Sequence, residues 1–196
     1  MMMPSMATPD FTNDFKRALS PAPIAVAMAD DVVPAAVLVV VTQDEAPSII
    51  LTRRSAHLHK HAGQISFPGG RVDPQDETLI ATALREAREE IALPFDHVSI
   101  CGFLPDMLTG TGYRVTPVVA QSTKTAHELQ ELLCPNPEEV DEILMVPLSV
   151  LLNDENYDSF MRHDKGVSWR SWRLIYEGQT IWGATAAILH KWAIAL

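Results

Sequence analysis

The chain has little cysteine and no apolar run long enough for a membrane span. Only two of its 196 residues are cysteines, Cys101 and Cys134, so a disulfide framework is not expected, and their spacing does not form a zinc site. The apolar run from 35 to 41 is far too short to cross a bilayer, and residues 1–11 lack the basic and apolar blocks of a signal peptide. We therefore expect a soluble cytoplasmic protein without a membrane partner.

Positive charge is also scarce. Fifteen Lys and Arg residues stand against 25 Asp and Glu residues, which gives a formal net charge of -10 and a pI near 5.0. This balance argues against nucleic acid or an anionic membrane as a partner, so a polyanionic ligand must be bound by a local group of cations. A length of 196 residues with 47% hydrophobic residues predicts one domain over 1–196, with an N-terminal extension to about residue 30.

Apolar runs and turn residues predict a mixed sheet packed between helices. The runs 35–42 (AAVLVVVT) and 48–52 (SIILT) predict a hairpin, and a short strand at 64–67 precedes the break Pro68-Gly69-Gly70. Continuous apolar runs are typical of strands covered on both faces, and the irregular order of elements favours an α/β fold with a mixed β-sheet between helices. Further strands are expected at 98–104, 115–120, 143–146 and 172–176, and further helices at 126–133, 148–152 and 184–194.

Apolar residues at helical spacing predict a helix from 78 to 91 that carries an acidic stripe. Glu86, Glu89 and Glu90 stand at i, i+3 and i+4, so their side chains converge on one side of the helix and repel one another. A divalent cation relieves such repulsion, and oxygen ligands favour Mg²⁺ or Mn²⁺ over zinc. The alternative is a solvated acidic face on which Arg85 and Arg88 pair with the glutamates.

A glycine turn upstream of this helix favours the metal-binding interpretation. Residues 67–71 (FPGGR) allow the backbone to approach an oxyanion closely, and Asp73, Asp76 and Glu77 lead from the turn into the helix. Mg²⁺ in proteins is typically shared with substrate phosphates. The combination of turn and helix therefore predicts phosphate chemistry.

Residues 67–93, FPGGRVDPQDETLIATALREAREEIAL, resemble a Nudix box, with the core of the match at 70–93. The pattern has one inserted loop residue, so that the expected acid is Asp76 when counted from Gly70 and Glu77 when counted back from Arg85, and Ala92 replaces the last glycine. The resemblance implies a Nudix-type α/β/α sandwich in which Glu86, Glu89 and Glu90 hold the metal ions. It also implies that Arg85 braces the helix by pairing with an acid such as Glu77 or Glu89, and that Gly70 lets the loop close onto the site.

A group of basic residues adjoins the glycine turn. No acidic residue lies between Glu45 and Asp73, which in so acidic a chain favours a local anion site, with pairing to acids elsewhere as the alternative. His57, His59 and His61 also form an H-x-H-x-H string, and we interpret them as phosphate contacts or polar loop residues in preference to metal ligands. The group consists of Arg53, Arg54, His57, His59, Lys60, His61 and Arg71.

The segments 51–55 (LTRRS) and 63–70 (GQISFPGG) resemble the motif that precedes the Nudix box in coenzyme A pyrophosphatases, and 104–119 and 181–186 resemble the same branch. The resemblance implies that coenzyme A, or an acyl or oxidised form of it, is split into 3′,5′-ADP and the phosphopantetheine half. Many relatives dimerise, so a homodimer is one expected form. The expected substrate-binding residues are Arg53, Arg54, Ser55, His61, Phe67, Gly69, Gly70 and Arg71.

The expected mechanism is attack of water on phosphorus, with Glu86 as the first candidate for the proton acceptor and Glu90 or Glu139 as the next. Arg85, Glu86 and Glu90 are thus the expected catalytic residues. One alternative keeps the chemistry but takes ADP-ribose, NADH or another nucleoside diphosphate derivative as substrate. A second is a catalytically silent module that only binds a nucleotide. The last part of the chain contains four tryptophans, at 169, 172, 182 and 192, and we expect them to pack in the core or a dimer interface in preference to stacking on a base.

Overall fold

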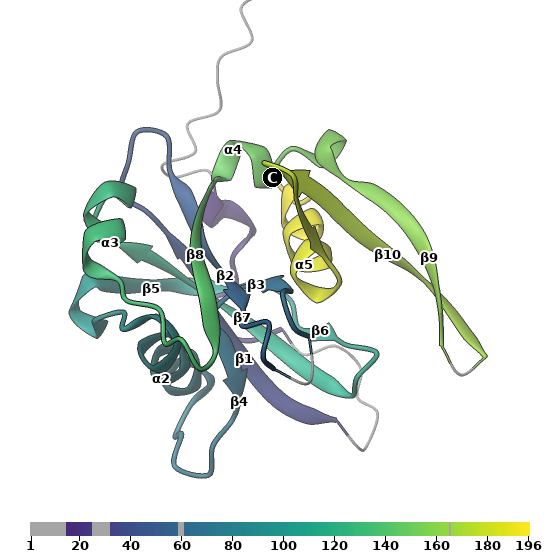
Figure 1. The fold of residues 1–196 in the computed structure, drawn as a ribbon, viewed down its shortest axis with the longest axis horizontal. Coiled ribbons are helices and arrows are strands. Elements are labelled where there is room, and N and C mark those ends of the chain that lie inside the picture. Colours follow the sequence, from purple (N-terminus) through teal and green to yellow (C-terminus); the bar gives the residue numbers. More distant parts are fainter. Residues whose placement is uncertain (1–14, 25–31, 59–60, 165) are drawn as a thin grey trace, which may run out of the picture.

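The computed structural model describes residues 15–24, 32–58, 61–164 and 166–196, and a mixed sheet of eight strands lies at its centre (Figure 1). The strand order is β3-β2-β1-β7-β5, while β4 also pairs with β1, β6 with β7 and β8 with β2. β1 and β7 run parallel, and the other pairs of this sheet are antiparallel. The strands are β1 (Val33–Val41), β2 (Ser48–Arg54), β3 (Ile65–Ser66), β4 (Gly69–Arg71), β5 (Val98–Phe103), β6 (Met107–Leu108), β7 (Tyr113–Ser122) and β8 (Val140–Pro147).

The central strand β1 is buried on both faces. Leu38 and Val40 pack in one core cluster with α2 and α3, whereas Val39 and Val41 pack in a second cluster with α4 and α5. Alternate residues of a strand point to opposite faces, so the continuous apolar run is explained by helices on both sides. This arrangement confirms the expected α/β/α sandwich with a mixed sheet. The helices are η1 (Phe15–Ala18), α2 (Leu79–Ile91), η2 (Phe95–His97), α3 (Ala126–Leu132), α4 (Leu148–Leu151), η3 (Asp154–Asn156) and α5 (Ala184–Ala193).

A second sheet of three strands was not predicted. It consists of β9 (Asp158–Asp164), β10 (Val167–Tyr176) and β11 (Gln179–Trp182), and β9 and β10 form a long hairpin that extends past α5 (Figure 1). The sequence indicated only the stretch 172–176, because much of the hairpin is solvated: Met161, in the strand β9 that was missed, is 53% exposed. A strand without an apolar run gives a weak pattern in the sequence.

The expected break at Pro68-Gly69-Gly70 is in part a strand. Gly69 and Gly70 belong to β4, which pairs antiparallel with β1 so that Gly69 lies opposite Val37. A Cβ atom on Gly69 would lie 2.5 Å from the carbonyl oxygen of Ala36, so only glycine fits this close approach. The glycines therefore mark a tight pairing with the central strand instead of the end of a strand.

The start of the described chain is tied to its end. Phe15 is fully buried, lies edge-on against Trp192 at a ring-centroid distance of 6.2 Å, and accepts a hydrogen bond on its carbonyl oxygen from Trp192 Nε1 at 3.2 Å. Most of the expected N-terminal extension, residues 1–14 and 25–31, lies outside the described residues. Within the described part of the chain, no helix has both the length and the apolar character needed to span a membrane.

Candidate active site

The acidic helix α2 begins and ends at defined caps. Thr78 is the N-cap, and its hydroxyl accepts a hydrogen bond from the Ala81 amide at 3.1 Å. Ala92, at the position where the resemblance expects glycine, ends the helix with a φ of 55° and donates its amide to the Arg88 carbonyl at 2.9 Å. A non-glycine residue in this left-handed conformation costs about 1 kcal/mol. The predicted helix is confirmed, with its first helical residue at Leu79.

Glu90 is a buried carboxylate with few neutralising contacts. The residue is 3% exposed. Its carboxylate accepts a hydrogen bond from the Gly69 amide at 3.3 Å and lies 3.8 Å from the Arg54 guanidinium. Burial, together with the charge on Glu86, raises the pKa of Glu90 to about 8 against the opposing effect of Arg54. An additional cation beside this carboxylate would therefore be favoured.

Glu86 lies against the second glycine of β4. A Cβ atom on Gly70 would fall 2.4 Å from the carboxyl carbon of Glu86, so a larger residue at this position would displace the Glu86 carboxylate from its present place. Burial raises the pKa of Glu86, Arg85 lowers it, and the charges of Glu89 and Glu139 raise it. Four acidic groups thus act on one another in this region, since Glu139 also raises the pKa of Glu90.

Arg85 connects the glycine loop to the acidic helix. Its guanidinium donates to both oxygens of Asp76, at 3.0 and 2.9 Å, and to the Arg71 carbonyl at 3.1 Å. Nη1 also donates to Glu86 and to Glu89, each at 3.0 Å. The two-point contact with Arg85 holds the pKa of Asp76 well below its ordinary value and raises that of Arg85.

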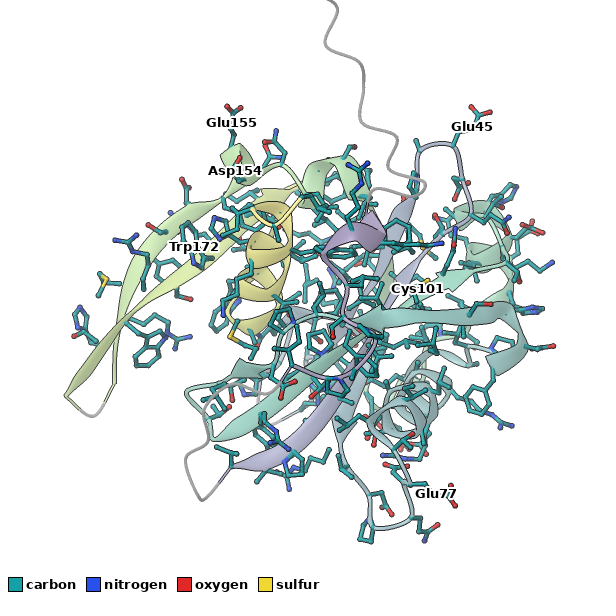
Figure 2. All side chains as sticks on the ribbon, turned by 180° about the vertical axis from the view of Figure 1, so that it is seen from behind. Glu45, Glu77, Cys101, Asp154, Glu155 and Trp172 are labelled. Carbon is teal, nitrogen blue, oxygen red and sulfur yellow. The ribbon has the colours of Figure 1, made fainter. Side chains whose placement is uncertain are left out.

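This geometry decides between the two acids that the loop insertion left open. Of the two acids named as examples for the pairing with Arg85, Glu89 is a partner, whereas the loop acid that Arg85 contacts is Asp76 and not Glu77. Glu77 is exposed and points away from the molecule at the tip of the loop (Figure 2). Counting forward from Gly70 is therefore the correct alignment, and the inserted residue follows Asp76.

The three glutamates of α2 differ in their surroundings. Glu90 is buried, the Glu86 side chain is 16% exposed and the Glu89 side chain is 53% exposed. Among the residues that the structure describes, no three acidic, histidine or cysteine side chains are already gathered closely enough to form a metal site. In this conformation Arg85 hydrogen-bonds to Glu86 and Glu89, two of the three glutamates. A metal ion that binds there must therefore compete with the guanidinium for these carboxylates.

The predicted substrate-binding residues fall into different places. Arg54, Gly69 and Gly70 lie beside the glutamates of α2. Arg71 is exposed and contacts the hydroxyl of Tyr113, a residue to which the sequence gave no role. His61 lines a pocket formed with the second sheet.

The remaining predicted residues are engaged elsewhere. Arg53 forms an ion pair with Glu142 at 2.9 Å. Phe67 is buried in the core, and the buried Ser55 accepts a hydrogen bond from the His57 amide at 3.5 Å. His59 and Lys60 lie outside the described residues. The basic group is thus split by the fold, with Arg54 at the carboxylates and His61 at the pocket.

Replacing Asp76 with asparagine is expected to lower the free energy of unfolding by roughly 2 kcal/mol, because it weakens a charged two-point hydrogen bond. The Asp76 side chain is 6% exposed and its pKa is lowered in the folded state, so its stabilising contribution is present at neutral pH and lost as the pH falls through the carboxyl range. The difference between Asp76→Asn and the wild type in urea unfolding should therefore shrink below about pH 4. Glu77→Gln serves as the control, and an equal loss in both variants would contradict the assignment of Asp76.

Replacing Glu90 with glutamine is expected to stabilise the metal-free protein at alkaline pH. Glu90 has a raised pKa of about 8 in the folded state, so its favourable contribution is complete at acidic pH and is lost as the pH rises through 8. The stability gain of Glu90→Gln in EDTA should accordingly grow between pH 5 and pH 8, to a few kcal/mol at most. Urea unfolding at both pH values measures this, and a gain that does not change with pH would refute it.

The comparisons with known proteins agree with this geometry. The family model described as NUDIX domain matches residues 32–164. The curated protein named "Uncharacterized Nudix hydrolase NudL" from Yersinia enterocolitica (serotype O:8 / biotype 1B) is 44% identical over 161 residues, which cover 81% of this chain and 79% of that protein. The protein of the same name from Yersinia pestis (strain Pestoides F) is 42% identical over 159 residues, covering 81% of this chain and 77% of that protein.

Among solved structures, a Nudix hydrolase from M. smegmatis, RenU, gives a TM-score of 0.48 at 24% identity and covers 60% of this chain and 71% of that one. The family model spans well over half of this chain, and both Yersinia relatives are matched over more than two thirds of their length. The chain therefore belongs to the Nudix hydrolase family, whose enzymes act on pyrophosphate bonds and generally use divalent metal ions.

Proposed function

We propose that this protein is a divalent-metal-dependent pyrophosphohydrolase that cleaves the diphosphate of coenzyme A or a derivative into 3′,5′-ADP and the (acyl-)4′-phosphopantetheine half. The observation that carries the hydrolase part is the placement of Glu86 and Glu90, two carboxylates with raised pKa values, against the glycines of β4. Support for coenzyme A comes from the segments 51–55 and 63–70, which resemble the motif of that branch.

The residues of α2 fit a magnesium or manganese ion. Glu90 is buried with a single amide donor at 3.3 Å and a guanidinium at 3.8 Å, so its charge is incompletely compensated. Glu86, Glu89 and Glu90 offer only oxygen donors, which are the ligands that Mg²⁺ and Mn²⁺ prefer. Divalent ions held by these three residues would supply positive charge to the diphosphate and lower the pKa of the attacking water.

The protein groups have distinct tasks in the proposed reaction. Water attacks one phosphorus, the bond from that phosphorus to the bridging oxygen breaks, and the departing phosphate takes the electron pair. Glu86 accepts the proton of the attacking water, because it adjoins both the glycine strand and the other carboxylates; Glu90 and Glu139 are the alternatives. Arg54 lies beside Glu90, and Arg71, whose guanidinium contacts Tyr113, follows the glycines of β4; both offset the negative charge of the diphosphate.

The chain is further proposed to form one domain. Residues of α5, including Trp192, share one core cluster with β1 and β2, so the C-terminal helix completes the core on the face of the main sheet opposite α2. The alternative of a catalytically silent nucleotide-binding module is disfavoured, because all three glutamates of the box are present at the expected spacing. A homodimer stays an expectation from the family resemblance.

Replacing Glu86 with glutamine is expected to reduce kcat by about 10²- to 10⁴-fold, since the variant loses the proposed proton acceptor and one metal ligand. Hydrolysis of coenzyme A in saturating Mg²⁺ measures the loss, and circular dichroism verifies that the variant is folded. Glu77→Gln is the matched control, because Glu77 is an exposed acid of the same loop. Near-normal turnover by Glu86→Gln would remove Glu86 from the mechanism.

Substrate choice can be tested by comparing the hydrolysis of candidate diphosphates in separate reactions. The wild-type enzyme is incubated with coenzyme A, ADP-ribose or NADH at equal concentration in Mg²⁺, and the products are separated by chromatography. We expect the largest kcat/KM for coenzyme A, with 3′,5′-ADP as the nucleotide product. A larger value for ADP-ribose or NADH would retain the metal chemistry and reject the proposed substrate, whereas no metal-dependent turnover of any of them would support the silent module.

A further inference from the structure

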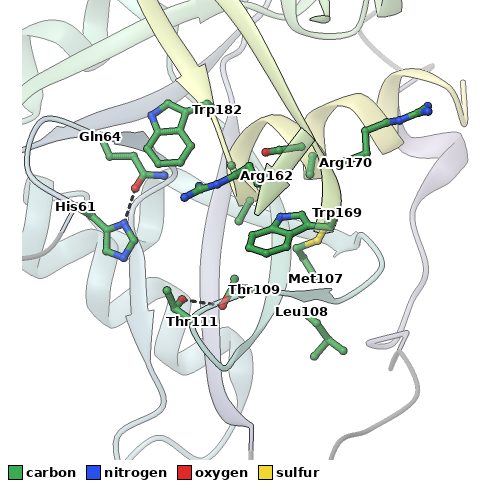
Figure 3. A pocket seen from close by; sticks show the side chains of 15 residues that line it. His61, Gln64, Met107, Leu108, Thr109, Thr111, Arg162, Trp169, Arg170 and Trp182 are labelled. Carbon is green, nitrogen blue, oxygen red and sulfur yellow. Dashed lines mark hydrogen bonds between the residues drawn. The ribbon is translucent and has the colours of Figure 1, made fainter. Parts of the chain in front are cut away.

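A pocket of about 270 Å³ opens beside the main sheet, between the β6–β7 loop, the β9–β10 hairpin, the start of α5 and the loop before β3 (Figure 3). It contains none of the glutamates of α2. None of the described residues that line it is acidic, although the chain carries a net charge of -10. His61 and Arg162 contribute to its lining, so the pocket suits an anionic ligand, whereas the side chain of Arg170 points away from the two tryptophan rings (Figure 3).

Two indole rings form its walls. Trp169 and Trp182 lie on either side of Arg162, whose guanidinium carbon is 5.8 Å from the first ring centroid and 5.0 Å from the second (Figure 3). The planar guanidinium lies against the faces of the two indole rings, and a flat aromatic base can stack on the same ring faces. Arginine can in addition grip a phosphate group with a two-point contact. The combination favours a nucleotide that carries both a base and a phosphate.

Both rims of the pocket are joined to the proposed active site. At one rim, the Arg54 amide donates to the Gln64 carbonyl at 3.0 Å, while the Arg54 side chain reaches Glu90; Gln64 also hydrogen-bonds to His61 at 2.7 Å. Gln64 lies in the pocket wall. Arg54 therefore contacts both a residue of the pocket wall and the buried carboxylate.

The other rim follows the loop between β6 and β7. Thr109, in the pocket wall, exchanges hydrogen bonds with Tyr113 at 2.9 and 3.0 Å. The Tyr113 hydroxyl contacts Arg71, and the Arg71 carbonyl accepts a hydrogen bond from Arg85. Arg54 and Arg71 thus connect the pocket wall to α2, Arg54 through Gln64 and Glu90 and Arg71 through Tyr113 and Arg85. The diphosphate of a long substrate would pass these two cations.

We propose that this pocket binds the adenosine 3′-phosphate end of the substrate. The base stacks on the indole of Trp169 or Trp182, and Arg162 turns from the rings to the 3′-phosphate, with His61 as a second polar contact. The phosphopantetheine end is the poorer fit, since its arm is neither aromatic nor anionic. The inference rests on the proposed coenzyme A substrate, and it identifies Arg162, Trp169 and Trp182 as residues that determine specificity.

The test is equilibrium binding, which does not require turnover. Adenosine 3′,5′-bisphosphate, adenosine 5′-monophosphate and 4′-phosphopantetheine are titrated by calorimetry into the wild type and the variants. Arg162→Ala should weaken the bisphosphate at least tenfold and the monophosphate little, which removes selectivity for the 3′-phosphate. Trp169→Ala and Trp182→Ala should weaken both nucleotides by roughly 5- to 100-fold where the ring stacks, and Trp182→Phe should restore part of the loss if Trp182 is the stacking partner.

Arg173→Ala is the matched control, because Arg173 is an exposed arginine of the same hairpin that pairs with Asp158 and does not line the pocket. It should leave all three affinities unchanged. Equal bisphosphate affinity in the wild type, Arg162→Ala and both alanine variants of tryptophan would overturn the proposal, as would a selective loss of phosphopantetheine binding. Variant-sensitive bisphosphate binding without hydrolysis of coenzyme A would instead reject the substrate alone, so the two failures are distinguishable.

Discussion

Gly70 and the Glu86 carboxylate approach one another so closely that a Cβ atom on the glycine would fall 2.4 Å from the carboxyl carbon. The same strand, β4, brings the Gly69 amide to the buried carboxylate of Glu90. The site therefore depends on a contact between backbone without side chains and two carboxylates withdrawn from water. Burial raises the pKa values of both acids. The fold tolerates these two negative charges because Arg54 and Arg85 partly neutralise them. In the proposed active form, divalent ions would neutralise them further.

Arg85 has two roles that oppose one another. Its two-point contact with Asp76 and its bond to the Arg71 carbonyl fix the glycine loop on the helix, which keeps β4 against Glu86. Its bonds to Glu86 and Glu89 neutralise the oxygens that a metal ion would use. Because Asp76 lies outside the proposed metal site, Arg85 can give up its bonds to Glu86 and Glu89 and still hold the loop through Asp76. The Asp76 side chain is only 6% exposed, whereas Glu77 is exposed.

The acidic charge of the chain is organised locally. The pocket between the two indoles has no acidic residue among its described lining residues, and Arg54 and Arg71 connect this pocket to α2 through Gln64 and Tyr113. In the proposed complex a negatively charged substrate crosses from a basic pocket to a metal-loaded acidic helix, and each of its charged groups meets a cation. The second sheet contributes Arg162, Trp169 and Trp182 to this surface, so the hairpin that extends past α5 has a direct place in the proposed recognition of substrate.

The sequence by itself determined most strands of the main sheet, though not β4 or β6, together with the helices that cover it and the acidic stripe of α2. Apolar runs and helical spacing are local patterns, and the placement of Glu86, Glu89 and Glu90 on one side follows from the helical period alone. Only the tertiary structure decided that Glu90 is buried while Glu89 is exposed, and that Asp76 instead of Glu77 meets Arg85. It also separated the tryptophans: Trp192 packs in the core as expected, whereas Trp169 and Trp182 line a pocket. Burial and pairing depend on which segments far apart in the chain come together, and no local pattern in β9 or β10 carries that information.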